Sequence, residues 1–248
     1  MKFKRFIAIS NRILLQIIGD KRTIGLIVVA PLIVMSLAGF SFINSKDVLN
    51  RIAPGLICTF AFFFTFLLTA VSFYRERVSG TLERLFTTPV TKTDVLLGYL
   101  FGFLPLALVQ ASLIVMYSIF VLRVDYEGNI FNIMLIIFLI ASISVNLGIF
   151  LSTFAKNEFQ IMQFIPVIFA PQIFLAGLIV PIDNLPIYFE ILSFAMPLRY
   201  AIESLQAVMI EGKSIAAIGD SIGILLGFNL FILGLSILSI KITNRYNV

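Results

Sequence analysis

Residues 52–73 read IAPGLICTFAFFFTFLLTAVSF, a run of 22 residues without a charged side chain. A helix rises about 1.5 Å per residue, so about 20 apolar residues cross the roughly 30 Å hydrocarbon core of a bilayer. This run is therefore predicted to be a membrane-spanning helix, and the rest of the chain can be interpreted outward from it.

Five further apolar runs have a comparable length. They cover residues 24–43, 95–122, 131–154, 161–180 and 216–240, and the one charged residue inside them is Asp220, near the outer end of the last run. A charge at the centre of a spanning helix costs about 2.5–3.5 kcal/mol on insertion scales, so its near absence is informative. The pattern predicts six spans.

Composition supports a membrane protein. Of 248 residues, 60% are apolar and only 12% are charged, about half the charged fraction of a soluble domain. A soluble fold of this size could not cover that much apolar surface. The expected fold is an all-α integral membrane protein with a single transmembrane domain over residues 1–248.

The sequence has no histidine, and its one cysteine is Cys58. A disulfide within the chain and a zinc site of the usual histidine and cysteine type are therefore excluded. The commonest general base is missing as well, and no paired carboxylates lie at mid-membrane. An intramembrane enzyme and a metal site are accordingly not expected, and no catalytic residue is proposed.

The basic residues predict the orientation. With the N-terminus inside, the cytoplasmic segments hold 13 of the 18 lysines and arginines and the outer segments hold 5. Because basic residues concentrate on the cytoplasmic side, both termini are expected there. This arrangement requires an even number of spans.

Two segments are expected to lie along the membrane surface. Residues 1–22 combine an apolar stripe with basic residues, which suits a helix on an anionic inner leaflet; a simple basic tail that directs topology is the alternative. Residues 181–215 are too apolar for a solvated loop, and parity excludes a seventh span. They predict short helices in or dipping into the outer leaflet, with Arg199 and Glu203 paired four residues apart.

The longest hydrophilic segment, residues 74–94, reads YRERVSGTLERLFTTPVTKTD. Ser79 suits a helix N-cap, Leu82, Leu85 and Phe86 share one helix face, and Pro89 stops the helix. A short amphipathic helix on the cytoplasmic side is predicted. It would cap the bundle, lie on the membrane, or insert into a groove of a partner.

The string RERxxGTLERLxxTPV in this segment resembles the first cytoplasmic loop of ABC-2-type permeases, most closely the small drug- and antibiotic-export branch. In that family the corresponding helix couples the permease to an ATPase subunit. The resemblance implies ATPase contacts at Glu76, Gly80, Thr81, Leu82, Glu83 and Leu85. The short loop with Lys156 and Glu158 is a second cytoplasmic contact candidate.

Residues 171–209 resemble the region after span five of the same family, which forms short re-entrant helices that close the translocation path in the dimer. This resemblance implies outer-gate roles for Gly177, Pro181, Pro186, Pro197, Arg199, Tyr200 and Glu203. Pro166 and Pro171 would kink span five, and simple packing kinks explain these two prolines as well as a gating role does. A structural pair explains Arg199 and Glu203. Asn146, Gln163 and Gln172 either tie helices together or line a path between two copies.

The resemblance implies the permease subunit of an ABC exporter in the plasma membrane, paired with a second permease copy. ATP and Mg²⁺ would bind to the partner ATPase, and this chain would hold no cofactor and no nucleic acid. Gly212-Lys213-Ser214 is not a phosphate-binding loop, because Ala207 stands where the motif requires glycine. Unlike larger family members, the chain has no large extracellular domain between spans one and two.

An amphiphilic cargo is expected, because the spans contain no charged binding cluster. Drug, antimicrobial peptide, lipid and ion export all fit this plan. An ion-coupled carrier is the main alternative, although such carriers usually keep ionisable residues at mid-membrane. Transport that an uncoupler abolishes and that is indifferent to ATP would favour the carrier.

Overall fold

The computed structural model describes residues 2–42 and 44–243, and the secondary structure of this part of the chain is helices joined by turns and loops, without a strand. The helices are α1 (Lys2–Gly19), α2 (Lys21–Ser41), α3 (Lys46–Val78), α4 (Thr81–Phe86), α5 (Lys92–Phe120), α6 (Ile130–Ser152), α7 (Glu158–Leu175), α8 (Ile187–Ser193), α9 (Pro197–Met209) and α10 (Gly219–Thr243). Two 3₁₀ turns, Ile182–Asn184 and Ile215–Ile218, precede α8 and α10.

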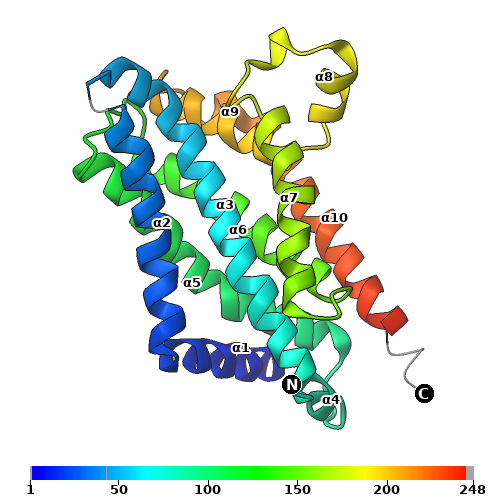
Figure 1. The fold of residues 1–248 in the computed structure, drawn as a ribbon. Coiled ribbons are helices and arrows are strands. Elements are labelled where there is room, and N and C mark those ends of the chain that lie inside the picture. Colours follow the sequence, from blue (N-terminus) through cyan, green and yellow to red (C-terminus); the bar gives the residue numbers. More distant parts are fainter. Residues whose placement is uncertain (1, 43, 244–248) are drawn as a thin grey trace.

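Within the described ranges, six helices are long and apolar enough to cross a membrane, which confirms the predicted number of spans. They cover Thr23–Ser41, Lys46–Val78, Lys92–Phe120, Ile130–Ser152, Glu158–Leu175 and Ile215–Ser239. In Figure 1 they form one bundle, with α1 and α4 at one end and α8 and α9 at the other. We refer to these as the α4 end and the α9 end.

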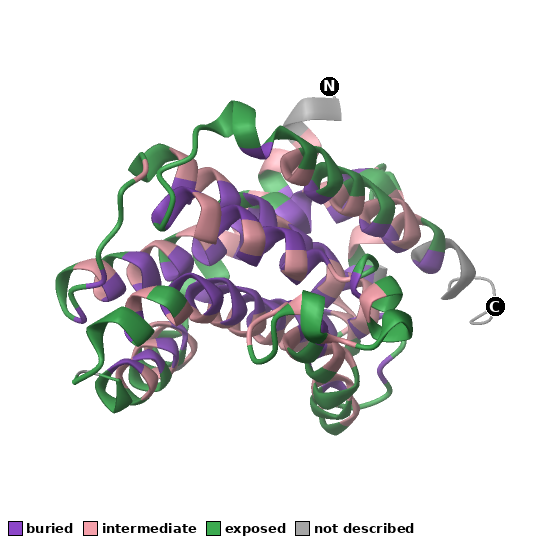
Figure 2. Ribbon diagram, turned by 90° about the horizontal axis from the view of Figure 1, so that it is seen from above, coloured by how far each residue is buried: buried purple, intermediate pink, exposed green. Residues whose placement is uncertain are grey.

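The core of the bundle lies around α3 and α6. Figure 2 shows the buried residues gathered in the interior of the bundle, with exposed residues around them. About two thirds of the most apolar part of each of these helices is buried, against about a fifth in α2, α7 and α10. Aromatic contacts join the core to α7, since the Phe169 ring lies 5.0 Å from that of Phe62 and 5.3 Å from that of Phe66. The peripheral helices expose apolar faces, as expected in lipid.

Helix α1 lies across the α4 end of the bundle (Figure 1). Part of its apolar stripe packs on the protein, because Ile9, Ile13 and Ile17 are buried in a cluster with residues of α5. Two glycines of α5 allow this close approach. A Cβ atom at Gly98 would come within 2.7 Å of the Ile9 side chain, and one at Gly102 within 3.0 Å of Ile13.

The predicted helices after span five are present as α8 and α9, but the apolar face of α9 packs against the bundle. This apolar face, Leu198, Ala201, Ile202 and Leu205, is at most 1% exposed and packs into the main core. Helix α8 stands apart from the bundle in Figure 1 and exposes most of its side chains. The apolar residues of 181–215 therefore lie in two environments: those of α9 are buried in the core, and most of those of α8 are exposed.

Candidate functional site

The α4 end is organised around the last turn of α3. This helix runs on to Val78, so Arg75, Glu76 and Arg77 belong to it and not to the loop that the sequence predicted. Gly80, with φ +71°, makes the sharp turn into α4 and is its N-cap. The prediction of Ser79 as that N-cap was wrong, because Ser79 instead ends α3.

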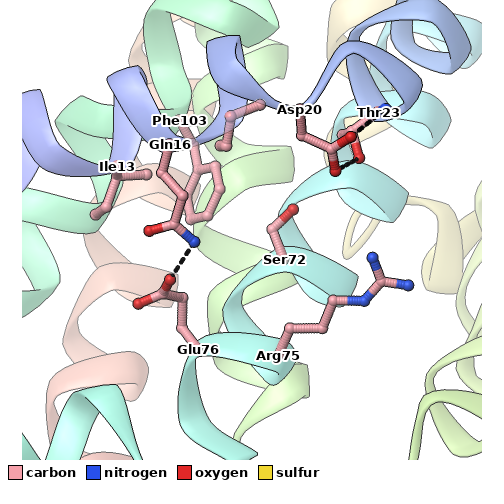
Figure 3. A pocket seen from close by; sticks show the side chains of 9 residues that line it. Ile13, Gln16, Asp20, Thr23, Ser72, Arg75, Glu76 and Phe103 are labelled. Atoms are coloured by element: carbon pink, nitrogen blue, oxygen red, sulfur yellow. Dashed lines mark hydrogen bonds between the residues drawn. The ribbon is translucent and has the colours of Figure 1, made fainter. Parts of the chain in front are cut away.

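Glu76 points into the chain. Its carboxylate accepts hydrogen bonds from Arg12 Nη2 at 2.7 Å, Gln16 Nε2 at 2.5 Å and Tyr99 Oη at 2.9 Å. Figure 3 shows the Gln16 bond beside a small cavity. Burial disfavours the charge on Arg12, but the hydrogen bond and charge of Glu76 outweigh it and raise the pKa of Arg12.

Polar groups from three helices therefore meet at Glu76, which joins α3 to α1 and α5. The sequence had assigned Glu76 to direct ATPase contact, but its side chain is only 8% exposed and is engaged within the chain. Arg12 and Tyr99 were not among the sequence candidates. The sequence held two signals that could have identified them: the hydroxyl of Tyr99 in an apolar span and the charge of Arg12 beside the apolar stripe of α1.

Arg77 joins the same turn to the connection between α6 and α7. Its guanidinium donates to the carbonyl oxygens of Thr153 and Ala155, which stand just after α6. Tyr74 Oη donates to the carbonyl oxygen of Lys156 at 2.9 Å. The two connections at the α4 end are thus one hydrogen-bonded unit.

Glu158, at the start of α7, completes this unit from the outside. Arg75 Nε and Nη2 donate to its two carboxylate oxygens at 2.8 and 3.1 Å. Both side chains remain exposed, Arg75 at 60% and Glu158 at 45%. Lys156 is exposed as well. Both candidates in this connection, Lys156 and Glu158, therefore lie on the surface of the α4 end.

The other sequence candidates in and around α4 divide by exposure. Leu82 is 7% exposed and packs into the cluster that includes α1 and α5, so it anchors α4. Gly80, Thr81 and Leu85 are half-buried, and the side chain of Glu83 lies outside the described residues. The accessible surface includes Arg84, Thr87, Thr88 and Pro89, which the sequence interpretation did not single out.

At the α9 end the candidates stabilise the turns. Gly177 adopts φ +78° directly after α7, and Pro181 and Pro186 precede the Ile182–Asn184 turn and α8. Pro197 is the first residue of α9, where a missing N–H costs nothing.

Arg199 and Glu203 pair as expected, with Nε and Oε1 2.8 Å apart. Arg199 also donates to Ser193 Oγ and lies over the Phe194 ring at 4.4 Å, while Tyr200 Oη donates to the Phe194 carbonyl oxygen at 3.1 Å. These bonds hold α8 against the start of α9.

The polar residues proposed for a path have different surroundings. Asn146 Nδ2 donates to Asn229 Oδ1 of α10 at 3.1 Å, and Gln172 Oε1 accepts from the backbone N–H of Leu198 at 3.2 Å. Both residues therefore tie helices together within the chain. Gln163 is exposed on α7, unlike the other two, which are buried.

Comparison with known proteins gives a consistent result. The sequence model of the ABC-2 type transporter family matches residues 4–210. ABC transporter G family member 20 of Dictyostelium discoideum is 30% identical over 169 residues, which are 68% of this chain and 23% of that protein. The probable multidrug ABC transporter permease YbhS of Escherichia coli is 29% identical over 195 residues, 77% of this chain and 51% of YbhS.

The inner membrane transport permease YhhJ of Escherichia coli is 28% identical over 148 residues, which are 59% of this chain and 39% of YhhJ. The chain thus spans about half or less of the length of these relatives. The match from residue 4 to residue 210 includes nearly all of α1, the α4 end and α9.

Proposed function

Because the chain belongs to the ABC-2 type transporter family, we propose that it is the transmembrane permease subunit of an ABC exporter. It moves an amphiphilic substrate outward with ATP that a separate ATPase subunit hydrolyses. The observation that carries this proposal is the α4 end, where a short helix with an exposed polar edge follows the last turn of α3, and that turn is hydrogen-bonded to α1, to α5 and to the connection between α6 and α7. ATP and Mg²⁺ bind to the ATPase, and this chain supplies the docking surface.

The bonds at the α4 end suggest how a movement of α4 reaches the spans. Leu82 anchors α4 in the buried cluster, and Gly80 connects it directly to α3. From α3, Glu76 passes the displacement to α1 and α5, and Arg77 passes it to the connection between α6 and α7. A push on α4 therefore moves five helices together instead of bending one loop.

The working assembly is proposed to contain a second permease copy, with identical chains as the simplest case. The exposed apolar faces of α2, α7 and α10 provide surface for lipid and for this copy. The plasma membrane, with both termini cytoplasmic, fits the distribution of basic residues. A drug-like cargo is favoured because YbhS is named a probable multidrug permease.

The test is purification of the natively expressed chain in mild detergent, followed by identification of the proteins bound to it. We expect a soluble subunit with a phosphate-binding loop in equal amount. Arg84→Glu, on the exposed edge of α4, should lower the amount recovered, whereas Arg123→Glu, between α5 and α6 at the α9 end, should not. A chain that is always free of an ATPase, even with an ATP analogue present, would contradict the proposal.

A further inference from the structure

Two adjoining cavities open beside the turn between α1 and α2. The first, of about 100 Å³, is a chamber whose walls combine Ile13, Ile17 and Phe103 with the polar residues Gln16, Asp20, Thr23, Ser72, Arg75 and Glu76 (Figure 3). The second, of about 290 Å³, is an apolar groove lined among others by Leu26, Ala30, Phe64, Leu67, Val71 and Met162. The sequence interpretation found no such cluster, because its residues come from distant parts of the chain.

The chamber and the groove are continuous. Thr23, Ser72 and Arg75 line both of them. The groove is formed by the apolar spans α2, α3 and α7, whereas the chamber lies at the end of α1, beside the turn into α2. Together the two volumes reach the lower end of the roughly 300–1,000 Å³ range of small-molecule sites. This combination suits a molecule with a polar head and an apolar tail.

The charges of the walls favour one kind of head group. Three carboxylates, Asp20, Glu76 and Glu158, line the chamber and the groove. The ion pair with Arg12 balances Glu76, which leaves Asp20 and Glu158 against one guanidinium, that of Arg75. Glu76 is held by Arg12, Gln16 and Tyr99, so it is a fixed part of the wall and not a movable ligand. Asp20 accepts from Thr23 Oγ1 at 2.6 Å and also forms part of the wall.

Glu158 is the carboxylate that a head group can reach. Its ion pair with Arg75 is 45% exposed on the Glu158 side and 60% exposed on the Arg75 side. Exposed ion pairs contribute only about 0–1 kcal/mol, so a second cation can replace Arg75 at little cost. Arg75 would then turn toward the open side of the chamber.

We infer that the chamber and groove bind an amphiphile with a cationic amine head group, taken up from the membrane leaflet at the α4 end. The head group lies beside Glu158 and Asp20, and the tail lies against Phe64 and Leu67. This inference rests on the proposed transport function and names the class of its substrate. An anionic head group would instead lie beside the two carboxylates Glu158 and Asp20.

The absence of tryptophan from the sequence allows a direct binding test. Phe64→Trp places a single fluorophore in the groove, and Phe131→Trp places one at an exposed position at the far end of α6. The purified full chain in lipid nanodiscs is titrated with 12-bromododecyltrimethylammonium, whose bromine quenches tryptophan. The anionic comparison probe is 12-bromododecyl sulfate.

We expect saturable quenching in the Phe64→Trp variant only with the cationic probe, and a non-saturating response in the Phe131→Trp variant with both probes. Equal saturation by the anionic probe, or the same titration curve in both variants, would overturn the inference. Binding is measured without any ATPase. If the chain binds the cationic probe saturably but never co-purifies with an ATPase, the binding site stands and the proposed function fails. If the chain co-purifies with an ATPase but does not bind the probe saturably, the proposed function stands and the binding site fails.

The ion pair between Arg75 and Glu158 provides two variants with opposite expected effects on binding of the cationic probe. Glu158→Gln in the Phe64→Trp background should weaken binding of the cationic probe roughly 3–10-fold, a loss of about 1 kcal/mol. Arg75→Gln frees Glu158 and should tighten binding. Asp183→Asn, at the α9 end, should leave it unchanged. Simple damage to the fold cannot produce both directions, and a shift of the same sign in the first two variants would contradict the assignment.

Discussion

Arg12 Nη2 lies 2.7 Å from Glu76 Oε2, although the two residues are 64 positions apart in the chain. The Arg12 side chain is 34% exposed and that of Glu76 is 8% exposed, so the pair is partly withdrawn from water. Tyr99 Oη contacts both residues. The bond makes α1 a structural part of the bundle, although its sequence is typical of a membrane-surface helix.

The coupling energy between Arg12 and Glu76 should therefore be measurable. In a double-mutant cycle with Arg12→Ala and Glu76→Ala, we expect an interaction energy of about 1–3 kcal/mol, because partly buried charged partners couple strongly. The free energy of unfolding in mixed micelles is the quantity to measure. Glu76→Ala alone should be destabilising, since it leaves Arg12 without its carboxylate.

The exposed pair Arg75 and Glu158 is the matched control for that cycle. It has the same residue types and a similar distance of 2.8 Å, but both side chains are about half exposed. Its interaction energy should stay below about 1 kcal/mol. Equal coupling energies in the two cycles would show that burial at Glu76 adds nothing.

The close packing of α1 against α5 gives a second prediction. Gly98→Ala places a Cβ atom 2.7 Å from the Ile9 side chain and 3.2 Å from the Phe6 carbonyl oxygen. Because such overpacking typically costs about 1–3 kcal/mol, the variant should be destabilised and α1 should become more accessible to protease.

Gly227→Ala in α10 is the control, because nothing lies within 4 Å of its added Cβ atom. It should be neutral or slightly stabilising, since alanine is the better helix former. Similar losses of stability in both variants would argue against specific packing of α1 on Gly98.

Arg77 gives a third prediction, on the connection between α6 and α7. Arg77→Lys retains the charge but loses the fork that reaches two carbonyl oxygens at once, so the connection should open more often. The rate of maleimide labelling at Ala155→Cys, a position in this connection that is only 1% exposed, should rise several-fold in this variant. Cys58 is fully buried and gives little background.

Arg84→Lys is the control for Arg77, because the bond from Arg84 reaches only across its own turn, to the Ser79 carbonyl oxygen. Its labelling rate at Ala155→Cys should match that of the parent. An unchanged rate in Arg77→Lys would mean that Arg77 does not hold the connection closed.

The six spans were predictable because each one is a long uncharged run whose length is set by the bilayer. The short helix at residues 81–86 was predictable from its apolar spacing and Pro89. The inward direction of Glu76 was not, because its partners Arg12 and Tyr99 are far away in the sequence, and local pattern gives no information on such contacts. The N-cap of α4 was also predicted wrongly, at Ser79. Gly80 can adopt φ +71°, and this turn makes α4 start one residue later than the side-chain preference of Ser79 suggests.

The polar residues of the spans provide the last prediction, which separates helix ties from path lining. Asn146→Leu breaks the bond to Asn229 and should cost about 0.5–2 kcal/mol of stability, the range for hydrogen bonds between membrane helices. Gln163→Leu changes an exposed position on α7 and should leave stability unchanged. If Gln163 lines a path between two copies, its variant should change the transport rate or cargo preference at unchanged stability. A stable Asn146→Leu chain with altered cargo preference would instead place Asn146 on the path.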